Sequence, residues 1–247
     1  MISPDYSLKK PQDQFSLMVS SFVEGGSLGM SAKIIAIAQQ KGGAGKTTIA
    51  VQLATAWTQQ GLKVAMLDVD PQGSLSAWYG MRKDAGIDST LIATDVQGWK
   101  LTTEIDRLKS TYDLLVIDTP PHAETDARVA VRAASLILVP VQPSPMDLWA
   151  TKPTLELARR EKSQALLVLN RVPARNKLAD TIRAKIAEDD LPLAATQLGN
   201  RSGFAASMME GKGLVETSPR STGAVEIRAL ADEIASILKL KTAKAAE

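Results

Sequence analysis

The chain of 247 residues contains no cysteine, a single histidine and few aromatic side chains, which make up 4% of its residues. Without cysteine it can form no disulfide, no thiolate metal site and no cysteine-held iron–sulfur cluster. It has no run of roughly 18 apolar residues, so the sequence predicts no transmembrane helix. The formal net charge of +2 is close to neutral, and gross charge therefore does not indicate a nucleic-acid-binding protein.

The beginning of the chain differs in composition from the rest. Lys9 and Lys10 precede the apolar stretch FSLMVSSFV, an arrangement that weakly resembles a secretory signal. However, Pro11 and polar residues separate the charges from the apolar stretch, and no convincing cleavage site follows. We therefore predict a loosely ordered extension over residues 1–31, with Met30 as a second candidate start.

Apolar runs of strand length alternate with helical patterns along the remaining sequence. The runs are continuously apolar, as expected for strands buried on both faces of a parallel sheet. They cover residues 33–39, 63–69, 112–118, 135–141 and 165–172. Helical patterns cover residues 46–60, 99–109, 124–134, 146–161 and 177–189. This order predicts one α/β domain over residues 32–240, a doubly wound, mostly parallel sheet flanked by helices, followed by a polar tail over 241–247.

The stretch QQKGGAGKTT, residues 39–48, follows the first apolar run and leads into a helical pattern. It matches the phosphate loop G-x-x-x-x-G-K-[ST], except that Gln40 stands where the first glycine belongs. Its glycines let backbone N–H groups turn inward around phosphate oxygens. Lys46 can reach the β- and γ-phosphates of a nucleotide, and the Thr47 hydroxyl can ligate Mg²⁺. A glycine turn with an incidental lysine is the alternative, but the strand–loop–helix context favours an ATP site.

Two later apolar runs end in aspartate. KVAMLDVDPQGS carries Asp68 and Asp70, and LLVIDTPP carries Asp118. A single aspartate at a strand end is usually a turn former. Two such strands after a phosphate loop instead indicate a magnesium–nucleotide site. Asp118 fits the Walker B role of holding a Mg²⁺-bound water, and Asp70 is a candidate for positioning the attacking water and for contacting the metal.

The motifs KGGAGKTT, DVDPQGS and VIDTPP, in this order, resemble those of the ParA/MinD family of deviant-Walker P-loop ATPases, and the resemblance spans about residues 32–238. It implies ATP and Mg²⁺ as ligands and slow ATP hydrolysis. It also implies that Lys41, the additional lysine of the loop, reaches the phosphates bound by a partner subunit, so that ATP acts as a dimerising ligand. Gln40 is then an ordinary residue of the deviant loop.

The resemblance also implies roles for individual residues. The catalytic group is Lys41, Lys46 and Asp70. Asn170, in the stretch VLNRV, is similar to an asparagine that faces the adenine, and a turn residue is its alternative. The segment 140–151, PVQPSPMDLWAT, is similar to one that helps to build the dimer interface. The implied nucleotide-binding residues are Lys41, Gly42, Gly43, Ala44, Gly45, Lys46, Thr47, Thr48 and Asn170.

Several branches of this family do not fit the sequence. The absence of cysteine excludes the nitrogenase iron protein branch. The tyrosines, at positions 6, 79 and 112, do not form the C-terminal cluster of the related tyrosine kinases. Amidotransferase-like ligases need a substrate pocket and extra segments, and they are kept as the less favoured enzymatic alternative.

Membrane association of the MinD type is the second alternative. It needs a C-terminal amphipathic helix with bulky apolar residues opposite lysines. The C-terminal helical pattern has an apolar stripe that is typical of a core-packing face, and the following KTAKAAE carries no bulky apolar residue. The stripe consists of Ile227, Leu230, Ile234, Ile237 and Leu238. We therefore predict no membrane binding.

Partition-type ParA proteins bind DNA without sequence preference as ATP dimers. Residues 152–185 carry a local excess of Lys and Arg that the nearly neutral total hides. The resemblance implies DNA contacts at Arg201 and Arg220 and, as a weaker candidate, Lys212; the alternative for each is an ordinary surface cation. We predict a cytoplasmic, nucleoid-associated ATPase that positions a plasmid, chromosome region or protein assembly, and that a cargo-linked partner stimulates.

Overall fold

The computed structural model describes residues 31–87, 90–121, 124–175 and 177–242. The compact unit to which they belong is Ser31–Glu247. Except for Ser31, the predicted extension lies outside the described residues, and so does the predicted tail beyond Thr242.

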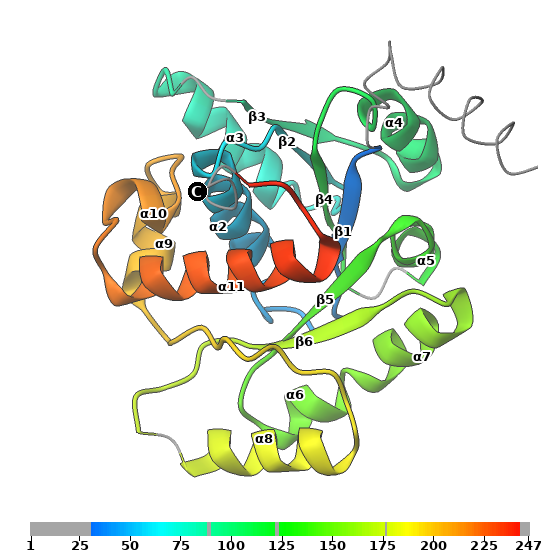
Figure 1. Ribbon diagram of the computed structural model, residues 1–247. Helices are drawn as coiled ribbons and strands as arrows, with labels where there is room; N and C mark the ends of the chain where they lie inside the picture. Colours follow the sequence, from blue (N-terminus) through cyan, green and yellow to red (C-terminus); the bar gives the residue numbers. More distant parts are fainter. Residues whose placement is uncertain (1–30, 88–89, 122–123, 176, 243–247) are drawn as a thin grey trace, which may run out of the picture. The chain divides into compact units, whose positions relative to one another are not determined.

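Six parallel strands form one sheet in the described part of the chain (Figure 1). They are β1 (Lys33–Ile37), β2 (Val64–Asp68), β3 (Leu91–Asp95), β4 (Leu114–Asp118), β5 (Leu136–Val141) and β6 (Ala165–Leu169). Their order is β3-β2-β4-β1-β5-β6. The connections that leave β1 and β5 run in opposite directions, so the carboxyl ends of these strands form a topological switch point, where open α/β sheets bind ligands.

Helices cover both faces of this sheet (Figure 1). Side chains of β1 alternate between the two layers: Ile35 and Ile37 join the core on one face, and Ala36 joins the core on the other. The first face is covered by α2 (Lys46–Gln59), α3 (Ser74–Asp84), α9 (Ser202–Met208), α10 (Leu214–Thr217) and α11 (Thr222–Leu238). The second is covered by α4 (Leu101–Leu108), α5 (Glu124–Ala133), α6 (Pro145–Trp149), α7 (Lys152–Glu161) and α8 (Lys177–Glu188). The predicted fold class is confirmed.

Strand register aligns the candidate site residues. β4 lies between β1 and β2, and Asp118 is paired with Ile37 of β1 and with Asp68 of β2. All five residues of β2 and all five of β4 are buried. The aspartates therefore end their strands at the same level, beside the loop that follows β1.

The predicted elements differ from the structure in two respects: one predicted helix is divided in two, and several elements were not predicted. The helix expected over residues 146–161 is two helices, α6 and α7, because Pro153 cannot lie in a helix interior and instead occupies the first turn of α7. The expected elements also lacked the edge strand β3 and the helices α3, α9 and α10. β3 is only partly buried and does not form a continuous apolar run, which removes the signal that identified the other strands.

The apolar stripe of α11 is confirmed as a packing face. Ile227, Leu230 and Ile234 are fully buried in the core that they share with α2. The Trp57 indole N–H of α2 donates to the Ala231 carbonyl oxygen over 3.2 Å. None of the described helices is long and apolar enough to cross a membrane.

Candidate nucleotide site

The phosphate loop joins the carboxyl end of β1 to the amino end of α2. Gly43 and Gly45 have φ angles of 74° and 95°, a region that side-chain-bearing residues rarely occupy. A Cβ atom on Gly45 would also lie only 2.5 Å from Asn170 Nδ2. Because α2 begins at Lys46, the unpaired N–H groups and the positive end of its dipole lie next to this loop. The backbone alone therefore provides the elements of an anion site.

Lys46 is buried beneath the loop, with 7% of its surface exposed. Its Nζ donates to the Gln39 carbonyl oxygen over 3.2 Å. Burial lowers the pKa of Lys46 below its ordinary value, while the nearby carboxylates of Asp118 and Asp70 act in the opposite direction. The structure thus brings together the cation and the two carboxylates that the sequence predicted at one site.

Thr47 and Asp118 are in direct contact. The Thr47 hydroxyl donates to Asp118 Oδ2 over 2.6 Å. Asp118 is 1% exposed, and its Oδ1 is buried without a hydrogen-bond partner among the described residues. A buried, unpartnered carboxylate oxygen beside a hydroxyl fits a magnesium ion or a water bound to it.

The donor set supports the same fit. No group of three or more His, Asp or Glu side chains that could hold a metal ion occurs within the described ranges. Mg²⁺ does not need such a cage, because it usually keeps several waters and binds through one or two carboxylates plus substrate phosphates. Thr47 and Asp118 can supply the protein's share.

The burial of Asp118 makes its contribution to the stability of the fold depend on pH. Burial raises the pKa of Asp118 to about 7, with a smaller contribution from Asp68, while the Thr47 hydrogen bond acts against the increase. In the unfolded chain this carboxyl has a pKa of about 4. Since the folded-state pKa is the higher one, the stabilisation is fully present below about pH 4 and is lost as the pH rises through about 7.

We expect Asp118→Asn to remove this pH dependence, because asparagine is neutral at every pH. In the absence of nucleotide and Mg²⁺, the variant should be more stable than the unsubstituted chain at pH 8, by up to about 4 kcal/mol, and close to it in acid. Urea unfolding at several pH values measures the difference. An equal difference at pH 5 and pH 8 would show that the Asp118 pKa is not raised.

The structure separates the roles of Asp68 and Asp70. Asp68 is fully buried, and its Oδ2 accepts hydrogen bonds from the N–H and the hydroxyl of Ser76, each over 2.8 Å. Its Oδ1 accepts from the Asp70 N–H over 3.2 Å. Asp68 therefore fixes the loop and the start of α3, whereas the half-buried Asp70 accepts only from the nearby Gln72 N–H among the bonds described for its side chain. The role of Asp70 in positioning water stays a prediction.

Lys41 is held by an acidic residue that the sequence analysis did not identify. Its Nζ lies 2.6 Å from Asp147 Oδ2, and the two side chains are 41% and 4% exposed. The Ser144 hydroxyl donates to the same oxygen, and it accepts from the Asp147 N–H at the start of α6. The additional lysine of the loop is therefore paired within its own chain, with the segment that the sequence assigned to a dimer interface.

Asn170 contacts the phosphate loop. Its Nδ2 donates to the Ala44 carbonyl oxygen over 2.9 Å, and its Oδ1 accepts from the Arg171 N–H over 2.9 Å. Next to it lies a cavity of about 420 Å³, lined by Gln142, Pro143, Ser144, Arg171, Pro173 and Asn200. The adenine contact stays a prediction, and this adjacent cavity provides space for a base.

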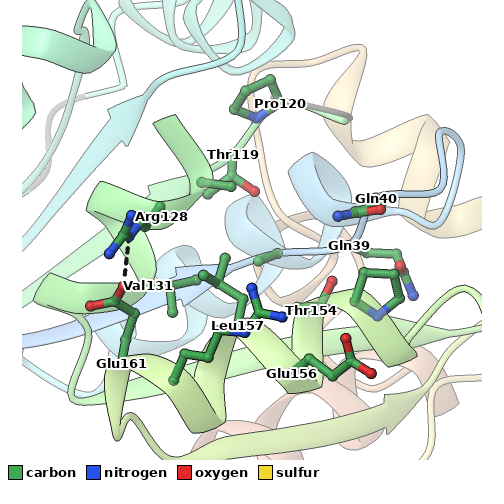
Figure 2. A pocket seen from close by; sticks show the side chains of 14 residues that line it. Gln39, Gln40, Thr119, Pro120, Arg128, Val131, Thr154, Glu156, Leu157 and Glu161 are labelled. Atoms are coloured by element: carbon green, nitrogen blue, oxygen red, sulfur yellow. Dashed lines mark hydrogen bonds and ion pairs between the residues drawn. The ribbon is translucent and has the colours of Figure 1, made fainter. Parts of the chain in front are cut away.

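A larger cavity, of about 510 Å³, lies between α5 and α7 (Figure 2). Gln39, Gln40 and Thr119 line the side near the phosphate loop, and the ion pair between Arg128 and Glu161 spans 2.7 Å at another side (Figure 2). Lys46, Thr47 and Asp118 do not line it. We therefore assign the nucleotide to the phosphate loop and not to the larger cavity.

The predicted DNA-contacting residues differ in their surroundings. Arg201 forms an ion pair with Glu226 through two hydrogen bonds, one of them 2.9 Å long. Lys212 lies 3.2 Å from Glu210. Arg220 is exposed, and its side chain forms no ion pair with any described residue. Their role in DNA binding stays a prediction, and Arg220 is the candidate with the least compensated charge.

Comparison with known proteins agrees with the site. A family model described as the CobQ/CobB/MinD/ParA nucleotide binding domain matches residues 35–215. Maintenance of carboxysome distribution protein A from Halothiobacillus neapolitanus is 32% identical over 215 residues, which cover 83% of this chain and 94% of the relative. Chromosome-partitioning ATPase Soj from Thermus thermophilus is 29% identical over 234 residues, covering 81% and 94%.

A solved structure has the same fold. The septum site-determining protein MinD from Pyrococcus horikoshii, complexed with Mg-ADP, matches with a TM-score of 0.73 at 24% identity and covers 84% of this chain and 97% of that one. The family match includes the phosphate loop and Asp118, which the fold brings together at its switch point. The chain therefore belongs to the CobQ/CobB/MinD/ParA nucleotide-binding family, as its motifs predicted.

Proposed function

We propose that the chain is a positioning ATPase of the ParA type, which binds ATP with Mg²⁺ and dimerises around it. The observation that carries the proposal is the convergence of Lys46, Thr47 and Asp118 at the topological switch point, with one Asp118 oxygen buried and unpartnered. Thr47 and Asp118 would hold Mg²⁺, which would offset phosphate charge during hydrolysis. Lys46 and the N–H groups of the loop would bind the phosphates, and Asp70 would position the attacking water.

Dimerisation is proposed to use the face that carries Lys41. On α6, beside the Lys41–Asp147 pair, the large apolar residues Met146 and Trp149 are 65% and 67% exposed. A second subunit that covers this face would bury them. Lys41 would then leave Asp147 and contact the partner's nucleotide, adding a positive charge that only the ATP-bound dimer provides.

We expect Asp147→Asn to favour the dimer. Asparagine can keep the contacts with Ser144 at the start of α6, but it removes the charge that holds Lys41 in the free chain. Half-maximal dimerisation should need about threefold to fivefold less ATP, the effect of a partly exposed ion pair. Light scattering during an ATP titration measures this value, with the exposed Glu156→Gln on α7 as control. An unchanged or higher ATP requirement would contradict the pairing role of Asp147.

Nonspecific DNA is the proposed surface on which the ATP dimer acts. The uncompensated charge of Arg220 supports this proposal, as does the basic excess over residues 152–185. Two such surfaces on a two-fold dimer would bind DNA weakly, without sequence preference and in a salt-sensitive way. The two curated relatives are named for carboxysome distribution and chromosome partitioning, which makes a protein assembly or a chromosome region the proposed cargo. A cargo-linked partner would stimulate hydrolysis and release the dimer.

Retention on random-sequence DNA at low salt tests this function. We expect retention with ATP and Mg²⁺ and none with ADP, and Arg220→Glu should weaken it about threefold to tenfold. Lys63→Glu makes the same charge change at an exposed residue just before β2 and is the matched control. Arg201→Glu is less informative because it also breaks the pair with Glu226. No ATP-dependent retention of the unsubstituted chain would refute nucleoid binding.

A further inference from the structure

Two side-chain amides meet the outer side of the phosphate loop. Gln142, which follows β5, donates from Nε2 to the Gly43 carbonyl oxygen over 3.1 Å. Asn170, which follows β6, donates from Nδ2 to the next carbonyl, that of Ala44, over 2.9 Å. The two donors come from the ends of adjacent, paired strands, so the sheet itself sets their spacing.

Peptide geometry connects these contacts to phosphate binding. In a planar trans peptide, the carbonyl oxygen points away from the N–H of the following residue. A donor that holds the Gly43 carbonyl therefore directs the Ala44 N–H to the opposite side, and a donor on the Ala44 carbonyl does the same for the Gly45 N–H. These N–H groups belong to the part of the loop that cradles phosphates. Glycine backbone at 43 and 45 is flexible, so an external constraint on it has an effect.

We propose that Gln142 and Asn170 are positioning residues that hold the phosphate loop in its phosphate-binding shape. The inference rests on the proposed nucleotide binding and deepens it. It gives Asn170 a function through the loop, and it assigns one to Gln142, which the sequence analysis placed only in the segment 140–151. Gln142 also lines the smaller cavity, and Asn170 immediately precedes Arg171, which lines it too.

Isosteric variants separate the donor from the rest of the side chain. Gln142→Glu and Asn170→Asp preserve the shape but place an acceptor against each carbonyl, and Asn170→Asp also preserves the acceptor for the Arg171 N–H. Gln142→Ala removes the amide altogether. Gln60→Ala is the matched control. Gln60 is also half-buried and also donates a side-chain hydrogen bond, to Asp232 over 2.7 Å, but it follows the carboxyl end of α2, away from the phosphate loop.

The measurement is displacement of a fluorescent ADP derivative by ADP and by tripolyphosphate, with Mg²⁺. Gln142→Ala should weaken both ligands by the same factor, about fivefold, which is the effect of one lost hydrogen bond. The two isosteric variants should weaken them further, and Gln60→Ala should leave them unchanged. Circular dichroism and thermal unfolding of each variant identify any general loss of folding.

Each result bears on the inference. Loss of ADP affinity with unchanged tripolyphosphate affinity would overturn it, because the amides would then contact the base or ribose. Unchanged affinity for both ligands would also overturn it. The inference would also be overturned if tripolyphosphate failed to displace the fluorescent ADP derivative from the unsubstituted chain, because the loop would then not hold phosphates by itself. Absence of ADP binding to the unsubstituted chain would instead refute the proposed function.

Discussion

Replacing Lys46 with alanine is expected to abolish ATP-dependent dimerisation. Lys46 is buried at the start of α2, and its positive charge interacts with the carboxylates of Asp118 and Asp70. Its Nζ contacts only a carbonyl oxygen among the hydrogen bonds described, so it is free to move to a phosphate. Loss of its charge-assisted bonds should weaken nucleotide binding by about tenfold to a hundredfold or more. It also leaves two nearby carboxylates uncompensated against the phosphates.

Light scattering with and without ATP measures the dimer, and titration with fluorescent ADP measures binding. Lys63→Ala is the control. Lys63 is an exposed lysine just before the amino end of β2, whereas the site lies at the carboxyl ends of the strands. It should bind and dimerise as the unsubstituted chain does. If Lys46→Ala still dimerised with ATP at unchanged concentrations, the nucleotide site would not be the phosphate loop.

Asp70→Ala is expected to slow ATP hydrolysis by about 10²- to 10⁴-fold while the ATP-bound dimer persists. The Asp70 carboxylate is half-buried, and in the described contacts it accepts only from the Gln72 N–H of its own turn. The fold of that turn depends instead on Asp68, which holds the Asp70 N–H and both donors of Ser76. Removing the Asp70 side chain should therefore affect chemistry more than architecture.

Phosphate release in single turnover measures the rate, and the lifetime of the dimer on DNA measures its persistence. Asp84→Ala, an exposed aspartate at the end of α3, should behave as the unsubstituted chain does. If Asp70→Ala instead lost the dimer at saturating Mg²⁺ and ATP, Asp70 would act in binding and not in positioning water. Asp68→Ala should lower the stability of the fold itself, which separates the two aspartates.

Much of the fold was predictable because its signals are local. Strands buried on both faces must be continuously apolar, and five of the six strands have this property in the sequence. β3 was missed because it lies at the sheet edge and is only partly buried, so it does not form a continuous apolar run. The helix predicted over residues 146–161 neglected Pro153, which gives a local signal for the boundary between α6 and α7.

The sequence by itself determined the family, and it predicted one candidate site that contains the phosphate loop, Lys46, Thr47 and Asp118. It could do so because the chemistry of phosphate and Mg²⁺ binding requires glycines, a lysine and strand-end aspartates. These residues occur in short motifs that can be recognised from the local sequence.

Only the tertiary structure decided which contacts these residues make with distant segments. Lys41 and Asp147 are 106 residues apart in the chain, and Gln142 and Gly43 are 99 apart, yet each pair is in contact. No local pattern records such pairs, because parallel strand order places the ends of β1 and β5 side by side at the switch point. The same strand order brings Asn170 to Ala44 and leaves Asp118 with one oxygen free for a ligand.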